Sequence, residues 1–331
     1  YPKEIDCSIY IKKPEAYQGS EEVKVHYEIR NNVLSYKVEK YDKNKTLIID
    51  PTAILTSSST DEAYALAIDN SGNVFVGGYT LNSSNFADYR VTYGTTGSWD
   101  AFVVKLSNDL STLYRTAILA SNSVDIAYAL AIDNSGNVFV GGYTLNSSNF
   151  AINRVIYGDT VGYDAFVVKL PNNLDTLYRT AILASNSVDI AYALAIDNSG
   201  NVFVGGYTAN SSNFAINRVT YGTTVGYDAF VVKLPNNLDT LYRTAILASN
   251  SNDEAHALAI DNSGNVFVGG YTANPSNFAT NRVTYGTTGG YDAFVVKLSN
   301  DLNTLYKTAI LASSSTDEAY ALAIDNSGNV F

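Results

Sequence analysis

The sequence of 331 residues contains one cysteine, no methionine, one tryptophan and six prolines. With Cys7 alone, no disulfide can form within the chain, which disfavours a disulfide-stapled secreted module but does not exclude export. No run of about 18 apolar residues is present, so we expect no membrane insertion in this segment. An initiator methionine and a signal peptide are also missing. Because the sequence begins mid-pattern and stops inside an expected strand, we expect it to be a fragment of a longer protein.

Basic side chains are scarce, since 21 Lys and Arg stand against 32 Asp and Glu, for a net charge of −11. Residues 1–52 carry nine charges of each sign, so the whole acidic excess lies in the rest of the chain. An acidic surface repels nucleic acid and anionic lipid, and neither is expected as a partner. Tyrosine is abundant, with 26 residues, and suits half-buried strands and amphipathic binding surfaces.

The sequence is dominated by a repeat. The phrase Asp-Asn-Ser-Gly-Asn-Val-Phe-Val-Gly-Gly-Tyr-Thr begins at positions 69, 133, 197 and 261, and a fifth copy starts at Asp325 and breaks off after Phe331. These starts are 64 residues apart, and a fixed period of this size indicates a repeat architecture. Four full units span residues 53–116, 117–180, 181–244 and 245–308, and residues 309–331 begin a fifth.

Each unit contains four β-type runs, which in the first unit are residues 63–68, 74–79, 101–106 and 113–119. The Asp-Asn-Ser-Gly-Asn turn between the first two predicts a hairpin in which Gly72 has a positive φ. Four short antiparallel strands per unit predict an all-β fold, a β-propeller of four-stranded blades, here an open arc of a larger ring. A solenoid is the alternative. We favour the propeller, because most β-solenoids stack parallel strands with shorter repeats, whereas tight hairpins require antiparallel pairing.

Residues 1–52 lack the repeat and contain short β-rich runs at 8–11, 23–29, 33–38 and 46–49, separated by turn residues. Asp50 and Pro51 end this segment, because proline cannot join a central strand and holds the preceding residue extended. We therefore predict a separate β-rich N-terminal segment over residues 1–52 and repeats over residues 53–331.

No catalytic, cofactor or metal site can be assembled from the sequence. Each Asp-Asn-Ser-Gly-Asn loop has one carboxylate, too few for calcium, and its Asp is expected to cap its own turn. The acidic pairs beginning at Asp61, Asp253 and Asp317 are interpreted as solvated charge. His256 replaces a recurring tyrosine and is interpreted as a packing change, and two His with one Cys supply neither a metal cluster nor a nucleophile–base pair.

Two sets of aromatic residues recur in the long loop between the second and third runs. Tyr93, Tyr157, Tyr221 and Tyr285 align within this loop. The set at its end, which we name the outer aromatics, consists of Trp99, Tyr163, Tyr227 and Tyr291. Aromatics repeated along one face can stack on sugars or on a protein partner, or they can fill gaps between repeats. The outer aromatics are the candidate ligand-contacting residues.

The phrase that runs from Ala67 to Thr80, followed by Asp-Ala-Phe-Val-Val-Lys-Leu from Asp100, resembles the bacterial β-propeller repeat called SBBP. The stretch 13–18, with Tyr41-Asp42 and the stretch 47–51, resembles the end of the β-rich, sandwich-like domain that often precedes those repeats. This resemblance implies a large exported or surface protein of bacteria or archaea. It brings no catalytic residues.

The near-identity of the units argues against an enzyme. Units 117–180 and 181–244 differ only at Leu145/Ala209, Ile156/Thr220 and Asp159/Thr223, whereas an active site needs different residues to converge on one point. Equal sites favour a multivalent or scaffold role. We therefore predict a non-enzymatic, extracellular or cell-surface structural scaffold or adhesion module that binds surface polysaccharide or protein. The alternatives are the substrate-binding part of a larger enzyme and an intracellular interaction scaffold.

Overall fold

The computed structural model describes residues 16–18, 21–30, 33–45, 47–49 and 53–331. The described residues divide into two compact units, with the division between Ile54 and Leu55. Cys7, the predicted strand at 8–11 and the predicted boundary at Asp50 and Pro51 lie outside the described residues. In the part of the chain that is described, no helix is long and apolar enough to cross a membrane.

The N-terminal unit contains two small antiparallel sheets. Its strands are β1 (Ala16–Gln18), β2 (Glu21–Val23), β3 (Val25–Arg30), β4 (Val33–Val38) and β5 (Ile48–Ile49). One sheet has the order β2-β1-β5, and β3 pairs with β4 in the other. Ala16, Val23 and Val25 are buried, with Val38 and Leu47 packed against them.

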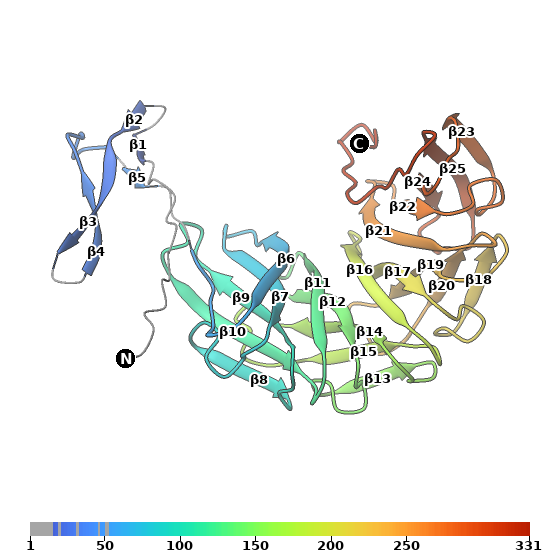
Figure 1. Cartoon of the computed structure of the whole chain (residues 1–331), viewed down its shortest axis with the longest axis horizontal. Helices are drawn as coiled ribbons and strands as arrows, with labels where there is room; N and C mark the ends of the chain where they lie inside the picture. Colours follow the sequence, from blue (N-terminus) through green and yellow to red (C-terminus); the bar gives the residue numbers. More distant parts are fainter. Residues whose placement is uncertain (1–15, 19–20, 31–32, 46, 50–52) are drawn as a thin grey trace, which may run out of the picture. The chain divides into compact units, whose positions relative to one another are not determined.

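Each of the four repeats forms a sheet of five strands (Figure 1). The first strands are β6 (Asp61–Ile68), β11 (Asp125–Ile132), β16 (Asp189–Ile196) and β21 (Asp253–Ile260). The second strands are β7 (Val74–Thr80), β12 (Val138–Thr144), β17 (Val202–Thr208) and β22 (Val266–Thr272). The short strands inside the long loop are β8 (Arg90–Gly94), β13 (Arg154–Tyr157), β18 (Arg218–Tyr221) and β23 (Arg282–Gly286). The next strands are β9 (Asp100–Leu106), β14 (Asp164–Leu170), β19 (Asp228–Leu234) and β24 (Asp292–Leu298). The last strands are β10 (Leu113–Ala120), β15 (Arg179–Leu183), β20 (Arg243–Leu247) and β25 (Leu305–Ala312).

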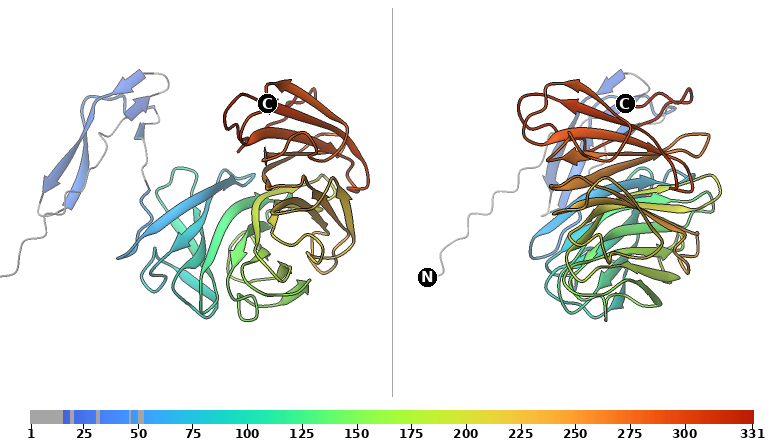
Figure 2. Two further views of the ribbon diagram at one scale, coloured as in Figure 1. Left: turned by 45° about the vertical axis from the view of Figure 1, so that its right-hand side comes forward. Right: turned by 90° about the vertical axis from the view of Figure 1, so that its right-hand side faces the viewer.

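The predicted propeller of four-stranded antiparallel blades is wrong. The strand order of the first sheet is β6-β7-β9-β10-β8, in which β8 pairs in parallel with β10. The repeats form an all-β solenoid, in which each repeat packs against its neighbours in the sequence. Figure 2 shows the repeats following one another from β6 to β25. The long loop contains a strand that pairs in parallel, so antiparallel hairpins make up only part of each repeat. The argument that tight hairpins exclude a solenoid therefore does not hold.

The first glycine of the Val-Gly-Gly-Tyr phrase joins consecutive repeats. A Cβ atom added at Gly141 would lie 3.1 Å from Cγ of Leu194 in the next repeat, and Gly77 stands in the same relation to Leu130. The hydrophobic core runs through these junctions, because the cluster around Phe75 includes residues of both the first and the second repeat. At each junction, therefore, a leucine of one repeat packs against a glycine of the repeat before it.

The second glycine makes room for a β-bulge in the first strand. Ala63 pairs with Gly78 and Ala65 pairs with Gly77, so Tyr64 is an extra residue without a partner in the ladder. A Cβ atom added at Gly78 would lie 1.9 Å from the carbonyl oxygen of Glu62. The bulge recurs at residues 128, 192 and 256. Because a bulge redirects a side chain, it gives these four positions a common orientation relative to their sheets.

Candidate functional site

The rings at the bulged positions form a continuous line across all repeats. Tyr64, Tyr128, Tyr192, His256 and Tyr320, which we name the central row, follow one another with centroid separations of 4.9, 5.2, 4.5 and 4.9 Å. The first strands that carry the row lie side by side along the inner side of the curved stack (Figure 1). The row therefore links the side chains of successive repeats into one surface.

A second tyrosine in each repeat supports the central row. These residues, Tyr79, Tyr143, Tyr207 and Tyr271, are the next-to-last residues of the second strands. The centroid of Tyr79 is 6.0 Å from that of Tyr64, and in the fourth repeat Tyr271 lies 5.5 Å from His256. Burial raises the pKa of Tyr79 to about 12, and its hydrogen bond to Glu62 acts in the same direction. The hydroxyl of Tyr79 is therefore protonated at neutral pH and can donate.

The outer aromatics each pack against the second-strand tyrosine of their own repeat. Trp99 stacks on Tyr79, with centroids 4.8 Å apart and planes at 10°. The equivalent separations for Tyr163, Tyr227 and Tyr291 are 5.1, 4.9 and 4.9 Å. The structure thus connects each outer aromatic through one tyrosine to the central row. Within the described residues, no two outer aromatics contact each other.

Part of this aromatic array is open to solvent. Tyr64 is 46% exposed, and Tyr320, in the partial fifth unit, is 63% exposed. Tyr227 and Tyr291 are 39% and 37% exposed, while Trp99 and Tyr163 are half-buried. The array therefore combines buried and partly exposed rings, which a stacking surface requires.

The recurring tyrosines inside the long loop have a different place. The hydroxyl of Tyr93 donates a hydrogen bond to the backbone carbonyl of Leu174 in the next repeat, 3.1 Å away, and Tyr93 is buried. Tyr157 and Tyr221 make the same contact with Leu238 and Leu302. These three tyrosines fill and tie the junctions between repeats.

The Asp-Asn-Ser-Gly-Asn turns are at the opposite end of the sheets, and their Asp caps the turn as predicted. Oδ1 of Asp69 accepts hydrogen bonds from the backbone N–H groups of Ser71 and Asn73, and Gly72 has a φ of 83°. Burial acts to raise the pKa of Asp69, but hydrogen bonds from Asn73, Asn172 and the backbone outweigh it and lower the pKa to about 2. These contacts are structural.

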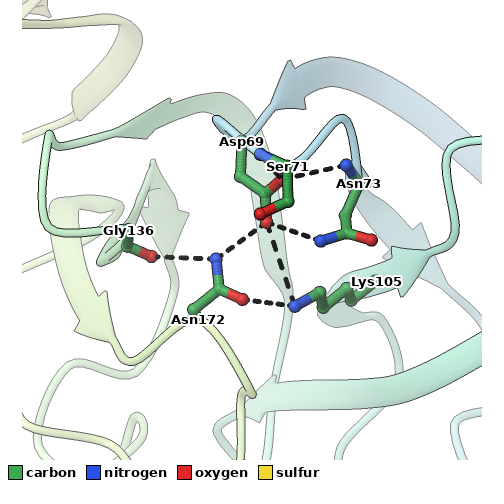
Figure 3. Close-up of polar contacts among 6 residues, drawn as sticks. All are labelled: Asp69, Ser71, Asn73, Lys105, Gly136 and Asn172. Atoms are coloured by element: carbon green, nitrogen blue, oxygen red, sulfur yellow. Dashed lines mark hydrogen bonds and ion pairs between the residues drawn. The ribbon is translucent and has the colours of Figure 1, made fainter.

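The same Asp belongs to a polar network that spans two repeats (Figure 3). The side-chain amide of Asn172 donates to Oδ2 of Asp69 at 3.0 Å and to the carbonyl of Gly136 at 3.3 Å. Lys105 donates to the amide oxygen of Asn172 and lies 3.9 Å from Asp69. The network recurs at the next two junctions, and a polar hollow of about 300 Å³ lies beside it between consecutive turns. Its charged groups are engaged with each other.

One predicted acidic pair, Asp253 with Glu254, is buried, whereas Asp61 and Asp317 are half-buried beside exposed glutamates. Asp253 is fully buried, as are the equivalent Asp125 and Asp189. Burial raises the pKa of Asp189 to about 7, against hydrogen bonds from Thr208 and Ser185, and the neighbouring Asp164 raises it further. The expectation of solvated charge is therefore wrong for the pair at Asp253, where the start of the first strand is hydrogen-bonded to Tyr227 of the preceding repeat. Within the described residues, no group of three or more His, Cys, Asp or Glu could hold a metal ion.

The central row was not singled out from the sequence, although a signal for it is present. An aromatic residue recurs at the same position of every first run, at 64, 128, 192, 256 and 320. The run otherwise alternates small and large residues, and the bulge that redirects this position cannot be read from local sequence. His256 extends the row by stacking on Tyr192 at 16°.

Comparisons with known proteins agree with the repeat and with the preceding segment. The SBBP family, described as a beta-propeller repeat, matches residues 47–87, 116–151, 180–215 and 244–279. A domain of unknown function, DUF7948, matches residues 6–52. No curated protein matches the chain.

A solved structure with weak similarity is the crystal structure of the GH43_1 enzyme from Xanthomonas citri complexed with xylotriose. It shares 8% identity with a TM-score of 0.36, over 83% of this chain and 91% of that chain. A likeness at this level indicates nothing about the activity of this chain. The family matches show that the chain belongs to the SBBP repeat proteins, with a DUF7948 segment before the repeats.

Proposed function

We propose that the repeats form a non-enzymatic binding module of an exported or cell-surface protein. The observation that carries this proposal is the continuity of the central row, in which an aromatic ring from every repeat contacts the ring of the next. Aromatic rings supply large contact areas at low conformational cost and are enriched where proteins bind partners.

The repetition favours an extended ligand. Each repeat offers the same rings in the same order, from the central row through the second-strand tyrosine to the outer aromatic. Weak equal sites that are fixed relative to each other add through effective concentration, provided that the ligand spans more than one of them. A surface polysaccharide or an elongated protein segment meets this condition. Catalysis, in contrast, does not require a ligand that spans several equal sites.

Binding to a panel of cell-surface polysaccharides and proteins tests the proposal. Alanine at Trp99, Tyr163, Tyr227 and Tyr291 together is expected to reduce affinity at least about tenfold, because stacking contacts of this kind contribute on the order of 1 kcal/mol each. The matched control replaces Tyr178 and Tyr242, which are half-exposed at the opposite end of the sheets. Unchanged binding by the folded outer-aromatic variant would exclude this surface as the ligand site.

The location is tested by protease treatment of intact source cells. A surface protein is expected to release peptides such as 155–169 without lysis. Their appearance only after lysis would favour the intracellular scaffold instead.

A further inference from the structure

The repeats differ chemically at one position next to the central row. The second residue of the first strand is Glu62 in the first repeat, Ile126 and Ile190 in the second and third, and Glu254 in the fourth. Glu318 holds the same position in the partial fifth unit. This position is therefore acidic in the first, fourth and partial fifth units and apolar in the second and third.

Glu62 lies among the aromatic rings of the first repeat. The hydroxyl of Tyr64 donates a hydrogen bond to Oε2 of Glu62 at 2.6 Å. Hydrogen bonds from Tyr64 and Tyr79 lower the pKa of Glu62, so its carboxylate is charged at neutral pH. Trp99 in turn stacks on Tyr79. Glu62 is exposed, and within the described residues it forms no ion pair with Lys or Arg.

Glu254 and Glu318 form a second cluster with the rings at the other end. Oε2 of Glu254 is 3.2 Å from Nε2 of His256, and Glu318 accepts a hydrogen bond from Tyr320. Burial raises the pKa of Tyr271, and both glutamates act in the same direction. Tyr271 packs edge-on against the partly exposed Tyr291. His256 packs edge-on against Tyr320, so the buried Glu254 and the exposed Glu318 contact two rings that touch each other.

Carboxylates beside aromatic faces select positive charge. An ammonium group gains from the negative face of Trp or Tyr and from the carboxylate together, and this combination recognises organic cations in aromatic cages. The rest of the repeats are acidic as well, with no excess of basic groups that would repel a cation.

We propose that these two clusters, Glu62 with Tyr64, Tyr79 and Trp99, and Glu254 and Glu318 with His256, Tyr271 and Tyr291, bind organic ammonium groups of an extended ligand. This inference rests on the proposed binding role and adds the charge of the ligand. The middle repeats, with isoleucine in place of glutamate, contribute stacking without charge selection.

Paired ligands that differ only in charge test the inference. Titration calorimetry of the full chain compares glucosamine oligomers with N-acetylated oligomers of equal length, and lysine peptides with their acetyl-lysine counterparts. The charged member of at least one pair is expected to bind at least about tenfold more tightly, the loss that removal of one charged contact produces. The two pairs distinguish a sugar source of the ammonium group from a peptide source.

The chain itself supplies the variants. Glu62→Ile, Glu254→Ile and Glu318→Ile together copy the chemistry of the second and third repeats, in which isoleucine is accommodated at this position. This triple variant is expected to lose the preference for charged ligands while its thermal unfolding stays cooperative. Equal affinity for charged and acetylated ligands, or a triple variant that retains the preference, would overturn the inference.

Failure of the inference is distinct from failure of the binding role. If the outer-aromatic variant loses affinity for acetylated oligomers while the triple glutamate variant does not, the surface binds ligands without selecting charge. If the outer-aromatic variant binds every ligand as the wild type does, the binding role itself fails.

Discussion

The hydroxyl of Tyr157 donates a hydrogen bond to the backbone carbonyl of Leu238, 3.2 Å away and 81 residues later in the chain. Tyr157 ends the parallel strand β13 of one repeat, and Leu238 lies in a turn of the next, with a positive φ of 58°. Tyr157 is buried, and β13 lies at the opposite edge of its sheet from β11, which carries the central row.

Removal of this hydroxyl is expected to weaken the junction. Tyr157→Phe leaves the buried carbonyl of Leu238 without its donor, which costs about 1–2 kcal/mol in free energy of unfolding. Chemical denaturation followed by circular dichroism measures the change. Tyr285→Phe is the matched control, because Tyr285 holds the equivalent position and is 58% exposed. Equal effects of the two variants would contradict the role of the junction contact.

The two glycines of the Val-Gly-Gly-Tyr phrase are expected to respond differently to alanine. In Gly142→Ala the new Cβ atom would lie 1.9 Å from the carbonyl oxygen of Ile126, so the bulge must move and about 3 kcal/mol or more is lost. In Gly141→Ala the Cβ atom meets the side chain of Leu194 at 3.1 Å, and that side chain can shift at a cost of about 1 kcal/mol. Thermal unfolding of the two variants gives the comparison. A reversed order would mean that the bulge is not required.

The buried Asp189 is expected to make part of the stability depend on pH. Its pKa is about 7 when folded and near its ordinary value of 3.8 when unfolded, so between these values the folded state holds a proton that the unfolded state has lost. Its contribution to the free energy of unfolding is therefore greatest below about pH 4 and falls as the pH rises through 7. The slope is at most about 1.4 kcal/mol per pH unit.

Unfolding of wild type and Asp189→Asn from pH 4 to pH 8 isolates this contribution. The stability of the wild type relative to the variant is expected to fall across this range. The exposed Asp159→Asn serves as the control and should leave the profile unchanged. Parallel profiles for wild type and Asp189→Asn would show that Asp189 does not change its protonation in this range.

The few differences between the second and third repeats are expected to be neutral. Leu145, Ile156 and Asp159 are all exposed, where their counterparts are Ala209, Thr220 and Thr223. Exchange of these three residues for Ala, Thr and Thr should change the free energy of unfolding by no more than about 0.5 kcal/mol. A larger loss by denaturation would assign a role to one of them in the fold.

The sequence predicted the features that depend on neighbouring residues. The capped turn at Asp69, the positive φ of Gly72 and four of the five strands in each repeat follow from local turn chemistry and apolar patterning. The strand β8 and its equivalents were missed, because Arg-Val-Thr-Tyr is short, lies within a polar loop and pairs in parallel with a strand that follows it in the sequence. Sequence patterning does not reveal such a pairing.

The site was predicted less completely than the strands. The outer aromatics were recognised from their alignment, but their connection to the central row depends on a bulge and on contacts between repeats. Both are properties of the stacked structure. The burial of Asp125 and its equivalents was missed for the same reason, since the covering residues come from the preceding repeat.

The leucine-in-glycine junction has a consequence for how such a chain can change its length. Because Leu130 meets Gly77 and Leu194 meets Gly141 through the same atoms, a unit of 64 residues that is duplicated or deleted at any junction recreates the contact that it interrupts. Unequal crossing-over between near-identical coding segments would thus yield folded proteins of different reach. The number of repeats can therefore change during evolution without a change in the contacts between repeats.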